Sequence, residues 1–253
     1  MKTIVFCNKK GGVGKTTSAL CFAAYLSILG KKVIGIDMDS QANFTMSSGG
    51  EDNVQGVLEF LKNAPLEDVF QNNGTYDFIG ADNRLSNVEG RLDSPIGKEF
   101  LLKRSLPRLS DIYDYCIVDT PSSMSLMTLN SLIAADELII CCQAEAFSAH
   151  AFDEIISNIK LIKENYNPNL QIAGILITLF DGRSNITKEM YKFFQDTADD
   201  MGIKIFSSTI RINAKLREAQ NKHKDIFTLF PKSNGAVDYI SVINEYLGGE
   251  NNG

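Results

Sequence analysis

The sequence predicts an α/β fold: a doubly wound, mostly parallel sheet with helices on both faces. Short apolar segments alternate along the chain with amphipathic segments of helical spacing, which is the pattern of successive strand and helix units. Some apolar segments, such as 172–178, are hydrophobic throughout, as expected of strands that helices cover on both faces. Ligands of such folds bind beyond the carboxyl ends of the strands, so polar residues at those ends are the functional candidates.

The first strand and helix are the most clearly defined. Residues 3–8 are short, apolar and rich in β-forming residues, which predicts a strand. Residues 15–29 place apolar side chains at helical spacing, and Gly30 ends the helix. Further strands are expected near 33–37, 76–80, 115–119, 137–142, 172–178 and 203–206, and further helices near 54–62, 98–109, 124–134, 148–165, 185–201, 213–221 and 235–247.

Composition indicates a soluble cytosolic protein. The chain has 253 residues, 44% of them hydrophobic, which is enough to bury a sizeable core. No internal repeat or low-complexity linker interrupts it, so we expect residues 1–247 to form a single domain, followed by a flexible tail at 248–253. Neither a signal peptide nor a run of 18 apolar residues occurs, so export and membrane spanning are not expected.

The cysteines are expected to be reduced core residues. There are five, an odd number, and none forms a CxxC pair. Four of them (Cys7, Cys116, Cys141 and Cys142) lie in apolar strand-like segments, where cysteine behaves as a small hydrophobe. A metal or redox role is the alternative.

A glycine-rich loop ending in lysine lies between the first strand and the first helix. In Asn8-Lys9-Lys10-Gly11-Gly12-Val13-Gly14-Lys15-Thr16-Thr17, the glycines allow backbone N–H groups to turn toward an anion at the positive end of the helix. Lys15 would contact the outer phosphates of a nucleotide, and Thr16 would hold Mg²⁺. A glycine turn without a ligand is the alternative, and Gly-Lys-Thr in this setting disfavours it. The usual pattern has glycine at position 9, where this chain has Lys9.

Carboxylates follow two of the other predicted strands. The strand at 33–37 ends in Asp37, and Asp39 follows after one residue. A carboxylate near a γ-phosphate and Mg²⁺ can orient water for in-line attack. The strand at 115–119 ends in Asp119, a pattern that positions Mg²⁺ in nucleotide hydrolases. Helix or turn capping is the alternative for each aspartate alone, but their combination with the glycine-rich loop favours a nucleotide site.

Four motifs resemble, in order, the ParA/MinD group of deviant phosphate-loop ATPases, most closely the short Soj-like ParA partition ATPases. They are Lys10-Gly-Gly-Val-Gly-Lys15-Thr-Thr, Asp37-Met-Asp39-Ser-Gln-Ala-Asn43, Asp119-Thr-Pro121 and Ile210-Arg-Ile-Asn-Ala-Lys-Leu-Arg-Glu-Ala219, and they cover the chain nearly end to end. Ser40 stands where the family commonly has proline, and Ser122 where it often has a second proline. The resemblance implies a deviant phosphate-loop NTPase fold with ATP and Mg²⁺ as cofactors.

The resemblance also implies a role for each site residue. Residues 10–17 would bind the nucleotide, and Lys10 would reach across an ATP-sandwiched homodimer to the partner's phosphates. Lys15 and Thr16 would serve the bound nucleotide and Mg²⁺, and Asp39 would organise the attacking water. Asp37 and Asp119 would support the metal shell.

The segment 204–232, near the end of the chain, is basic. Residues 204–232 contain seven Lys and Arg and two acidic residues, a local net charge of +5 in a protein of net charge −6. This asymmetry indicates an anionic partner such as DNA, whose nonspecific binding needs little more than phosphate neutralisation. A solvated lysine-rich face is an equally good explanation from charge alone.

The resemblance favours DNA, because Soj-like proteins carry DNA-binding residues in the loop that matches 180–185 and at the position of Lys215. We therefore expect Arg183 and Lys215 to bind DNA, with Arg217 and Lys222 as support. Arg211 stands where some relatives have proline near the adenine, so it is expected to serve the base.

Other members of the superfamily remain alternatives. A MinD-like membrane switch needs a basic amphipathic helix at its C-terminus, whereas residues 243–253 contain no basic residue. An iron–sulfur reductase of the nitrogenase type needs thiolates at its dimer seam, but these cysteines are mostly in strands. A small-molecule kinase or ligase, and a ParA-like ATPase that positions a protein assembly, both remain open.

The resemblance thus predicts an ATP-dependent switch for plasmid or chromosome segregation. The ATP-bound homodimer would bind double-stranded DNA without sequence preference. A ParB-like centromere-binding protein would stimulate hydrolysis and release. Such a protein is cytoplasmic and nucleoid-associated, with no membrane partner. The glycine-rich loop begins close to Met1, so no N-terminal helix-turn-helix is expected.

Overall fold

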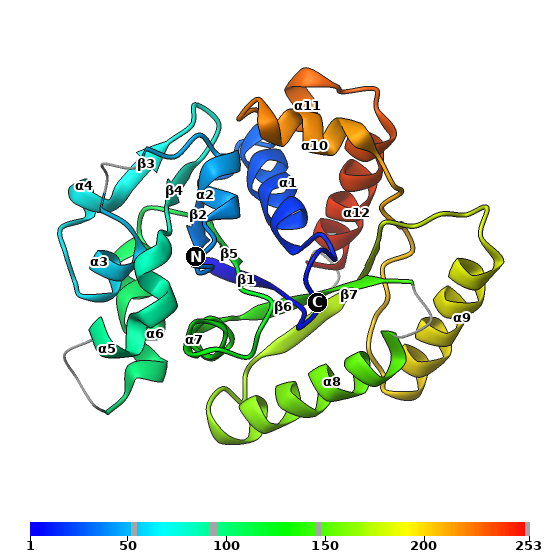
Figure 1. Ribbon diagram of the computed structural model, residues 1–253, viewed down its shortest axis with the longest axis horizontal. Helices are drawn as coiled ribbons and strands as arrows, with labels where there is room; N and C mark the ends of the chain where they lie inside the picture. The colour runs from blue at the N-terminus through cyan, green and yellow to red at the C-terminus, as the bar shows by residue number, and fades with distance from the viewer. Residues whose placement is uncertain (52–54, 92–95, 145–147, 251–253) are drawn as a thin grey trace.

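The computed structural model describes residues 1–51, 55–91, 96–144 and 148–250, and these form a seven-stranded sheet flanked by helices (Figure 1). The spatial order of the strands is β3-β4-β2-β5-β1-β6-β7. Their bounds are Lys2–Cys7 for β1, Val33–Asp37 for β2, Phe70–Asn72 for β3, Asp77–Ile79 for β4, Tyr115–Asp119 for β5, Glu137–Gln143 for β6 and Gln171–Thr178 for β7. All pairings are parallel except that of β3 with β4. The predicted fold class is confirmed.

The helices cover both faces of the sheet. The longer ones are α1 (Lys15–Ile28), α7 (Leu126–Ala134), α8 (Ser148–Asn165), α9 (Asn185–Asp200), α10 (Ala214–Asn221) and α12 (Asn234–Glu250). Short helices are α2 (Asn43–Ser47), α3 (Val57–Leu61), α4 (Leu66–Val69), α5 (Val88–Arg91), α6 (Leu101–Ser105) and α11 (Ile226–Leu229), with 3₁₀ turns η1 (Asn83–Asn87), η2 (Lys98–Phe100) and η3 (Leu106–Leu109).

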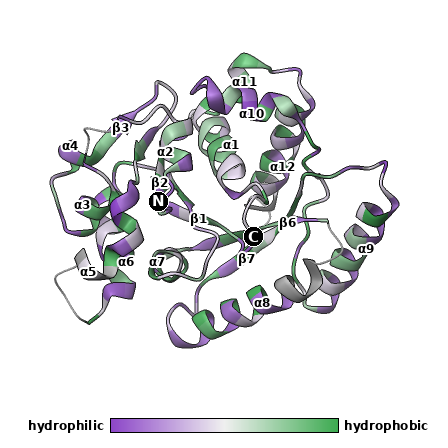
Figure 2. Cartoon of the chain, in the orientation of Figure 1, coloured by the Kyte–Doolittle hydropathy of each residue, from purple (hydrophilic) through white to green (hydrophobic). Residues whose placement is uncertain are grey.

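Two hydrophobic cores follow from this arrangement. One contains buried residues of α1, α10, α11 and α12, and the other contains those of α3, α6, α7, α8 and α9. Figure 1 shows α1 and α12 on one side of the sheet and α7 and α8 on the other. In Figure 2, α8 and α9 are banded with hydrophilic and hydrophobic residues, as expected of helices with one face on the core. The central strands β2 and β5 are buried along their whole length, which explains why they are apolar up to the aspartate that ends each of them.

Two predicted elements differ in the structure. The expected strand at 203–206 is only an isolated bridge, in which Ile205 pairs with Ile175 beside β7. The expected helix at 98–109 is divided into η2, α6 and η3, and Pro107 lies at the start of η3. Proline has no N–H to donate, so an α-helix cannot continue regularly through this position.

The observed bounds of other elements differ from the predicted ones, and the structure contains several short elements that the sequence did not predict. The helix expected at 54–62 covers only Val57–Leu61 among the described residues, and residue 54 lies outside them. The antiparallel β3 and the helices α2, α4, α5 and α11 are additional. At the C-terminus α12 continues to Glu250, beyond the predicted start of the tail, while 251–253 lie outside the described residues.

Candidate ATP and magnesium site

The glycine-rich loop joins β1 to α1 at the carboxyl edge of the sheet. Gly12 and Gly14 have φ values of +76° and +83°, in the left-handed region that favours glycine, and Gly14 is the N-cap of α1. The side chain of Asn8 fixes the loop entrance, because its Nδ2 donates to the Cys141 carbonyl at 2.6 Å and its Oδ1 accepts the Lys10 N–H at 2.9 Å. The loop is therefore preformed for an anion at the start of α1.

A second anchor comes from the far end of β7. The Thr178 hydroxyl lies 2.7 Å from the Val13 carbonyl oxygen and 3.2 Å from that of Cys142, so it bridges the loop to β6. A Cβ on Gly14 would lie 3.6 Å from the Thr178 side chain, in ordinary contact. The motif alone did not identify Thr178, which is far from the loop in sequence.

The lysine and threonine that end the motif face the carboxyl edge. Lys15 is 7% exposed, and its Nζ donates to the Lys10 carbonyl at 3.3 Å. The Thr16 hydroxyl donates to Asp119 Oδ2 at 2.7 Å. The structure thus brings together the motif at 10–17 and the aspartate that ends β5, as predicted.

Lys9, which replaces the usual glycine of the loop pattern, interacts with helix α8. It forms an ion pair with Glu154 of α8. Its side chain therefore ties the loop to the helix layer.

Two buried carboxylates face each other at this edge. Asp37 and Asp119 are register partners at the ends of β2 and β5, and both are fully buried. Burial raises the pKa of Asp37 to about 6, although hydrogen bonds from Thr45 and from the Asp39 N–H oppose the shift. Burial, and then the negative charge of Asp37, also raise the pKa of Asp119 well above its usual value, while the Thr16 hydroxyl and the Lys15 charge oppose this.

These residues fit a Mg²⁺ ion that arrives with nucleotide phosphates. Asp119 Oδ1 is buried without a hydrogen-bond partner among the described residues. Those residues also contain no group of three His, Cys, Asp or Glu side chains placed to hold a metal alone. Mg²⁺ commonly takes one or two protein ligands and fills its shell with water and phosphate oxygens. Thr16 and Asp119 would hold it, and the bound ion would neutralise charge on the phosphates.

Asp37 has a supporting position. Its Oδ1 accepts the Asp39 N–H at 3.0 Å, and its Oδ2 accepts the Thr45 N–H at 2.9 Å and the Thr45 hydroxyl at 2.7 Å. Both carboxylate oxygens of Asp37 therefore accept hydrogen bonds, and these hold the Asp39 N–H and Thr45 in place. Asp39 itself is half-buried in the turn after β2, where its Oδ1 accepts the Gln41 N–H at 3.0 Å.

A cavity of about 700 Å³ opens beside the loop. Predicted residues that line it are Gly12, Gly14, Lys15, Thr16 and Thr17, joined by Asn43, Met46, Ser47, Thr178, Leu179, Ile210, Asn213, Leu216, Arg217, Gln220, Asn221, His223 and Tyr239. Gln220 Nε2 donates to the Thr17 hydroxyl at 3.1 Å, which links α10 to α1 across it. This volume is within the range of cavities that hold small-molecule ligands.

Comparison with known proteins identifies the family of this chain. The family model described as an AAA domain matches residues 1–172. The sporulation initiation inhibitor protein Soj of Bacillus subtilis (strain 168) is 34% identical over 253 residues, which cover 96% of this chain and 97% of Soj. The chromosome-partitioning ATPase Soj of Treponema pallidum (strain Nichols) is 32% identical, and the matched region covers 97% of this chain and 97% of that protein.

The chain belongs to the ParA/Soj family of deviant phosphate-loop ATPases.

Solved structures support the assignment. Apo McdA from Cyanthece has a TM-score of 0.86 at 25% identity, with 98% of this chain and 99% of McdA covered. Cobyrinic acid a,c-diamide synthase from Mycobacterium smegmatis, with an ATP analogue and magnesium bound, has a TM-score of 0.80 at 27% identity, with 94% and 91% covered. Nucleotide and Mg²⁺ thus occur together in a protein similar to this ParA/Soj-family chain.

Two of the expected cationic residues of this ParA/Soj-family protein can be placed relative to the cavity. Arg211 forms an ion pair with Asp238 of α12, with Nη2 and Oδ1 2.6 Å apart, and it is not among the residues that line the cavity. Its neighbours Ile210 and Asn213 do line the cavity, so the expected role of Arg211 at the base stays a prediction. Arg217, expected at DNA, does line the cavity.

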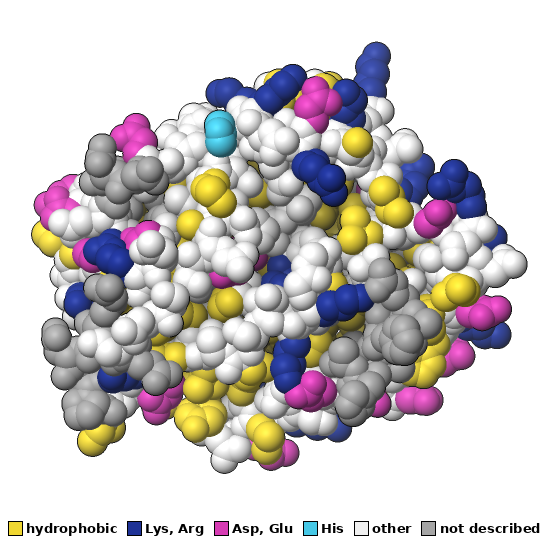
Figure 3. Space-filling model, in the orientation of Figure 1, with side chains coloured by type: hydrophobic (Ala, Val, Ile, Leu, Met, Phe, Trp, Pro, Cys, Tyr) yellow, Lys and Arg dark blue, Asp and Glu magenta, His cyan; other side chains and the backbone are white. Residues whose placement is uncertain are grey.

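A backbone contact relates the segments that carry two of the expected DNA residues. Phe180 N–H donates to the Ile210 carbonyl at 2.9 Å, so the loop that carries Arg183 adjoins the segment that leads to Lys215. Arg183 is 93% exposed in its side chain and pairs with Asp181. Figure 3 shows Lys and Arg side chains gathered along the top of the molecule, over α10 and α11.

Ion pairs reduce the charge of this basic segment. Glu218 pairs with both Lys215 and Lys222, at 2.6 and 3.2 Å, and both lysines also lie over the Phe230 ring. Arg211 and Lys204 are paired with Asp238 and Glu245, which lie outside 204–232. The local charge of +5 counted along the sequence therefore overstates the positive charge of the surface.

Proposed function

We propose that this protein is an ATP-dependent partition switch for DNA. In the proposed cycle, ATP with Mg²⁺ joins two subunits face to face, and Lys10 reaches the partner's phosphates. The dimer binds double-stranded DNA without sequence preference, and a ParB-like protein stimulates hydrolysis and release. The proposal places the protein in the cytoplasm, on the nucleoid. No helix in the described ranges is long and apolar enough to cross a membrane.

The position of α10 carries this proposal. One side of this short helix, with Leu216, Arg217 and Gln220, lines the cavity beside the glycine-rich loop. The same helix presents the exposed Lys215 to solvent, and Lys222 follows at its end. A nucleotide that contacts α10 can therefore alter the basic surface directly, as a switch requires.

Different residues of the ATP site would have different roles in hydrolysis. Lys15 and the N–H groups of the loop would bind the phosphates, and Asp39 would orient the attacking water. Asp37, beneath the Asp39 turn, fixes that turn through the Asp39 N–H. Catalysis of this kind depends mainly on positioning and charge stabilisation.

A DNA titration tests the proposal. Arg183→Ala combined with Lys215→Ala should weaken binding of a random duplex for all sequences and lower the log–log salt slope by about 1 for each lost phosphate contact. Lys62→Ala, which removes an exposed lysine after α3, is the matched control and should bind like the wild type. If the double variant binds DNA with unchanged affinity and salt slope, the DNA surface lies elsewhere.

A small-molecule enzyme is the second candidate. It is favoured by the likeness to the synthase and by a second cavity of about 410 Å³, which Met38, Ser40 and Pro121 help to line next to Asp39. Failure of the wild type to bind DNA with any nucleotide would favour this candidate, or a role in positioning a protein assembly.

A further inference from the structure

Thr45 donates two hydrogen bonds to Asp37. It lies in the first turn of α2 and is 8% exposed. Both its N–H and its hydroxyl bond to Asp37 Oδ2, at 2.9 and 2.7 Å. It is the only residue with a side-chain donor to Asp37 in the part of the chain that the structure describes.

The direction of the hydroxyl hydrogen bond is fixed by a third partner. The Ala81 N–H donates to Thr45 Oγ1 at 2.8 Å. A backbone N–H can only donate, so the hydroxyl accepts there and directs its single proton to Asp37. Asp37 Oδ2 is therefore the acceptor of two hydrogen bonds, and Oδ1 remains for the Asp39 N–H at 3.0 Å.

Two glycines make room for this side chain. A Cβ on Gly50 would lie 2.5 Å from the Thr45 methyl carbon, and one on Gly80 would lie 2.8 Å from it. No real Cβ contact is that short, so the Thr45 methyl fills a slot between the two glycines. The slot holds the side chain in the rotamer that points the hydroxyl at Asp37.

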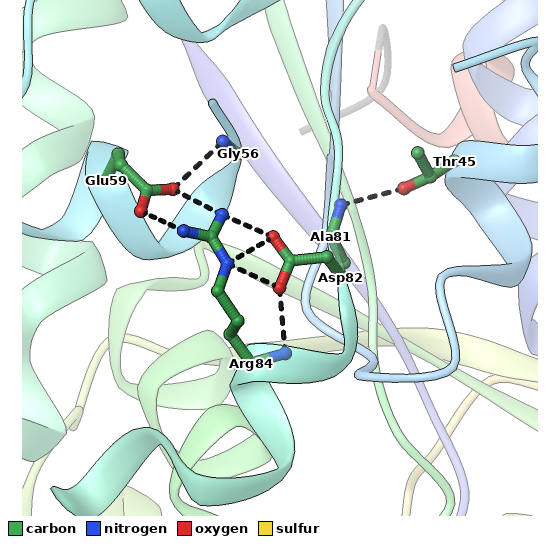
Figure 4. A network of polar contacts seen from close by, with 6 residues as sticks. All are labelled: Thr45, Gly56, Glu59, Ala81, Asp82 and Arg84. Atoms are coloured by element: carbon green, nitrogen blue, oxygen red, sulfur yellow. Dashed lines mark hydrogen bonds and ion pairs between the residues drawn. The ribbon is translucent and has the colours of Figure 1, made fainter. Parts of the chain in front are cut away.

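The donor to Thr45 is itself held by an ion-pair cluster, shown in Figure 4. Next to Ala81, Asp82 accepts the Arg84 Nε–H at 2.8 Å, and Arg84 Nη1 donates to Glu59 at 2.6 Å. Glu59 in turn accepts the Gly56 N–H at 3.1 Å. Ala81 therefore belongs to a cross-linked segment that joins the end of β4 to η1 and α3.

We infer that Thr45 is a positioning residue for the phosphate site: it sets the orientation of Asp37, and through it that of the Asp39 turn. With Oδ2 held by Thr45, Asp37 Oδ1 is oriented to accept the Asp39 N–H. The part of the inference that concerns hydrolysis rests on the proposed function. The part that concerns the Asp39 turn rests on geometry alone, so the two can fail separately.

The test compares Thr45→Val with Thr45→Ser. Valine keeps the branched shape and loses the hydroxyl, whereas serine keeps the hydroxyl. Three quantities are measured: amide hydrogen exchange of the segment 38–42 without nucleotide, the single-turnover rate of ATP hydrolysis, and the affinity for a fluorescent ATP analogue. Ser48→Ala is the matched control, because it removes another buried hydroxyl, which contacts Tyr76 at 2.9 Å.

For Thr45→Val we expect faster exchange at 38–42 and hydrolysis about 10- to 100-fold slower, with nucleotide affinity changed by less than about threefold. Ser48→Ala should stay within about threefold of the wild type in each quantity. Thr45→Ser, which keeps the hydroxyl but loses the methyl that fills the slot, should fall between the wild type and Thr45→Val. If Thr45→Val fails to fold, Gly80→Ala takes its place: it retains the hydroxyl but displaces the Thr45 side chain, and should give the same two changes.

Unchanged exchange at 38–42 in a folded Thr45→Val or Gly80→Ala protein would overturn the inference. Accelerated exchange with wild-type hydrolysis would overturn its catalytic part. A wild-type protein that does not hydrolyse ATP would refute the proposed function, and the exchange measurement would still decide whether Thr45 positions the turn.

Discussion

The paired carboxylates predict that the nucleotide-free protein becomes more stable as the pH falls from about 7.5 to about 5.5. Asp37 has a folded-state pKa of about 6, above the ordinary value of 3.8. A carboxyl with a raised folded pKa stabilises the protein fully below the unfolded pKa and loses this contribution as the pH rises through the folded pKa. Asp119 is shifted in the same direction.

The size of the effect follows from the pKa of Asp37. The difference between the folded-state pKa of Asp37, about 6, and its ordinary value of 3.8 destabilises the folded state by about 3 kcal/mol at pH values above 6. Each pKa unit corresponds to about 1.4 kcal/mol of this free energy. Between pH 7.5 and 5.5 the Asp37 contribution alone recovers about 1 kcal/mol. Asp119 adds to this. Asp181, Glu218 and Glu245 have lowered pKa values, so they remain ionised over this window and do not offset the gain.

The assay is urea unfolding followed by circular dichroism, since the chain has no tryptophan. Asp119→Asn should be more stable than the wild type at the higher pH and should show a smaller pH dependence, because one buried carboxyl and its repulsion of Asp37 are removed. Asp111→Asn, an exposed surface change, should behave like the wild type. A wild-type stability that falls between pH 7.5 and 5.5 would refute the reasoning.

Three further predictions concern the loop and its catalytic partner. Lys15→Ala should weaken ATP binding by about 100-fold, since a charged contact to phosphate is lost; calorimetry that finds wild-type affinity would contradict the phosphate-loop assignment. Asp39→Ala should slow hydrolysis by about 100-fold while the ATP dimer still forms, and unchanged turnover in a phosphate-release assay would remove its role. Lys10→Ala should abolish ATP-dependent dimerisation, measured by sedimentation, with monomer nucleotide binding retained; a variant that dimerises normally would exclude the cross-subunit contact.

The sequence predicted best those features that depend on residues close together in the chain, such as strands and turns. Buried strands such as β2 and β5 are apolar up to their final aspartate, and the loop between β1 and α1 has Gly12 and Gly14 where φ is positive. The fold class and the edge that carries the site could therefore be predicted. The strand expected at 203–206 was wrong because an apolar run does not show how many backbone pairs it will make, and here Ile205 makes one bridge. Pro107 carried a visible signal for the break in the helix expected at 98–109.

Partners far apart in sequence could not be predicted. Thr178 bonds to Val13 and Arg211 to Asp238 across long separations, and no local periodicity indicates either pair. The same limit applies to Arg217, which is expected at DNA and also lines the cavity. Net charge over a segment also ignores acidic residues that fold against it from elsewhere, as Asp238 does.

The central claim, that nucleotide at the cavity controls the basic surface through α10, is tested most directly by the ratio of DNA affinities with ATP and with ADP. Fluorescence anisotropy of a labelled random duplex with the Asp39→Ala protein gives this ratio while hydrolysis during the titration is slowed by about 100-fold. Binding at least about tenfold tighter with ATP, and weakened by salt in proportion to the phosphates contacted, is the predicted result. Equal affinities with ATP and ADP would contradict the claim.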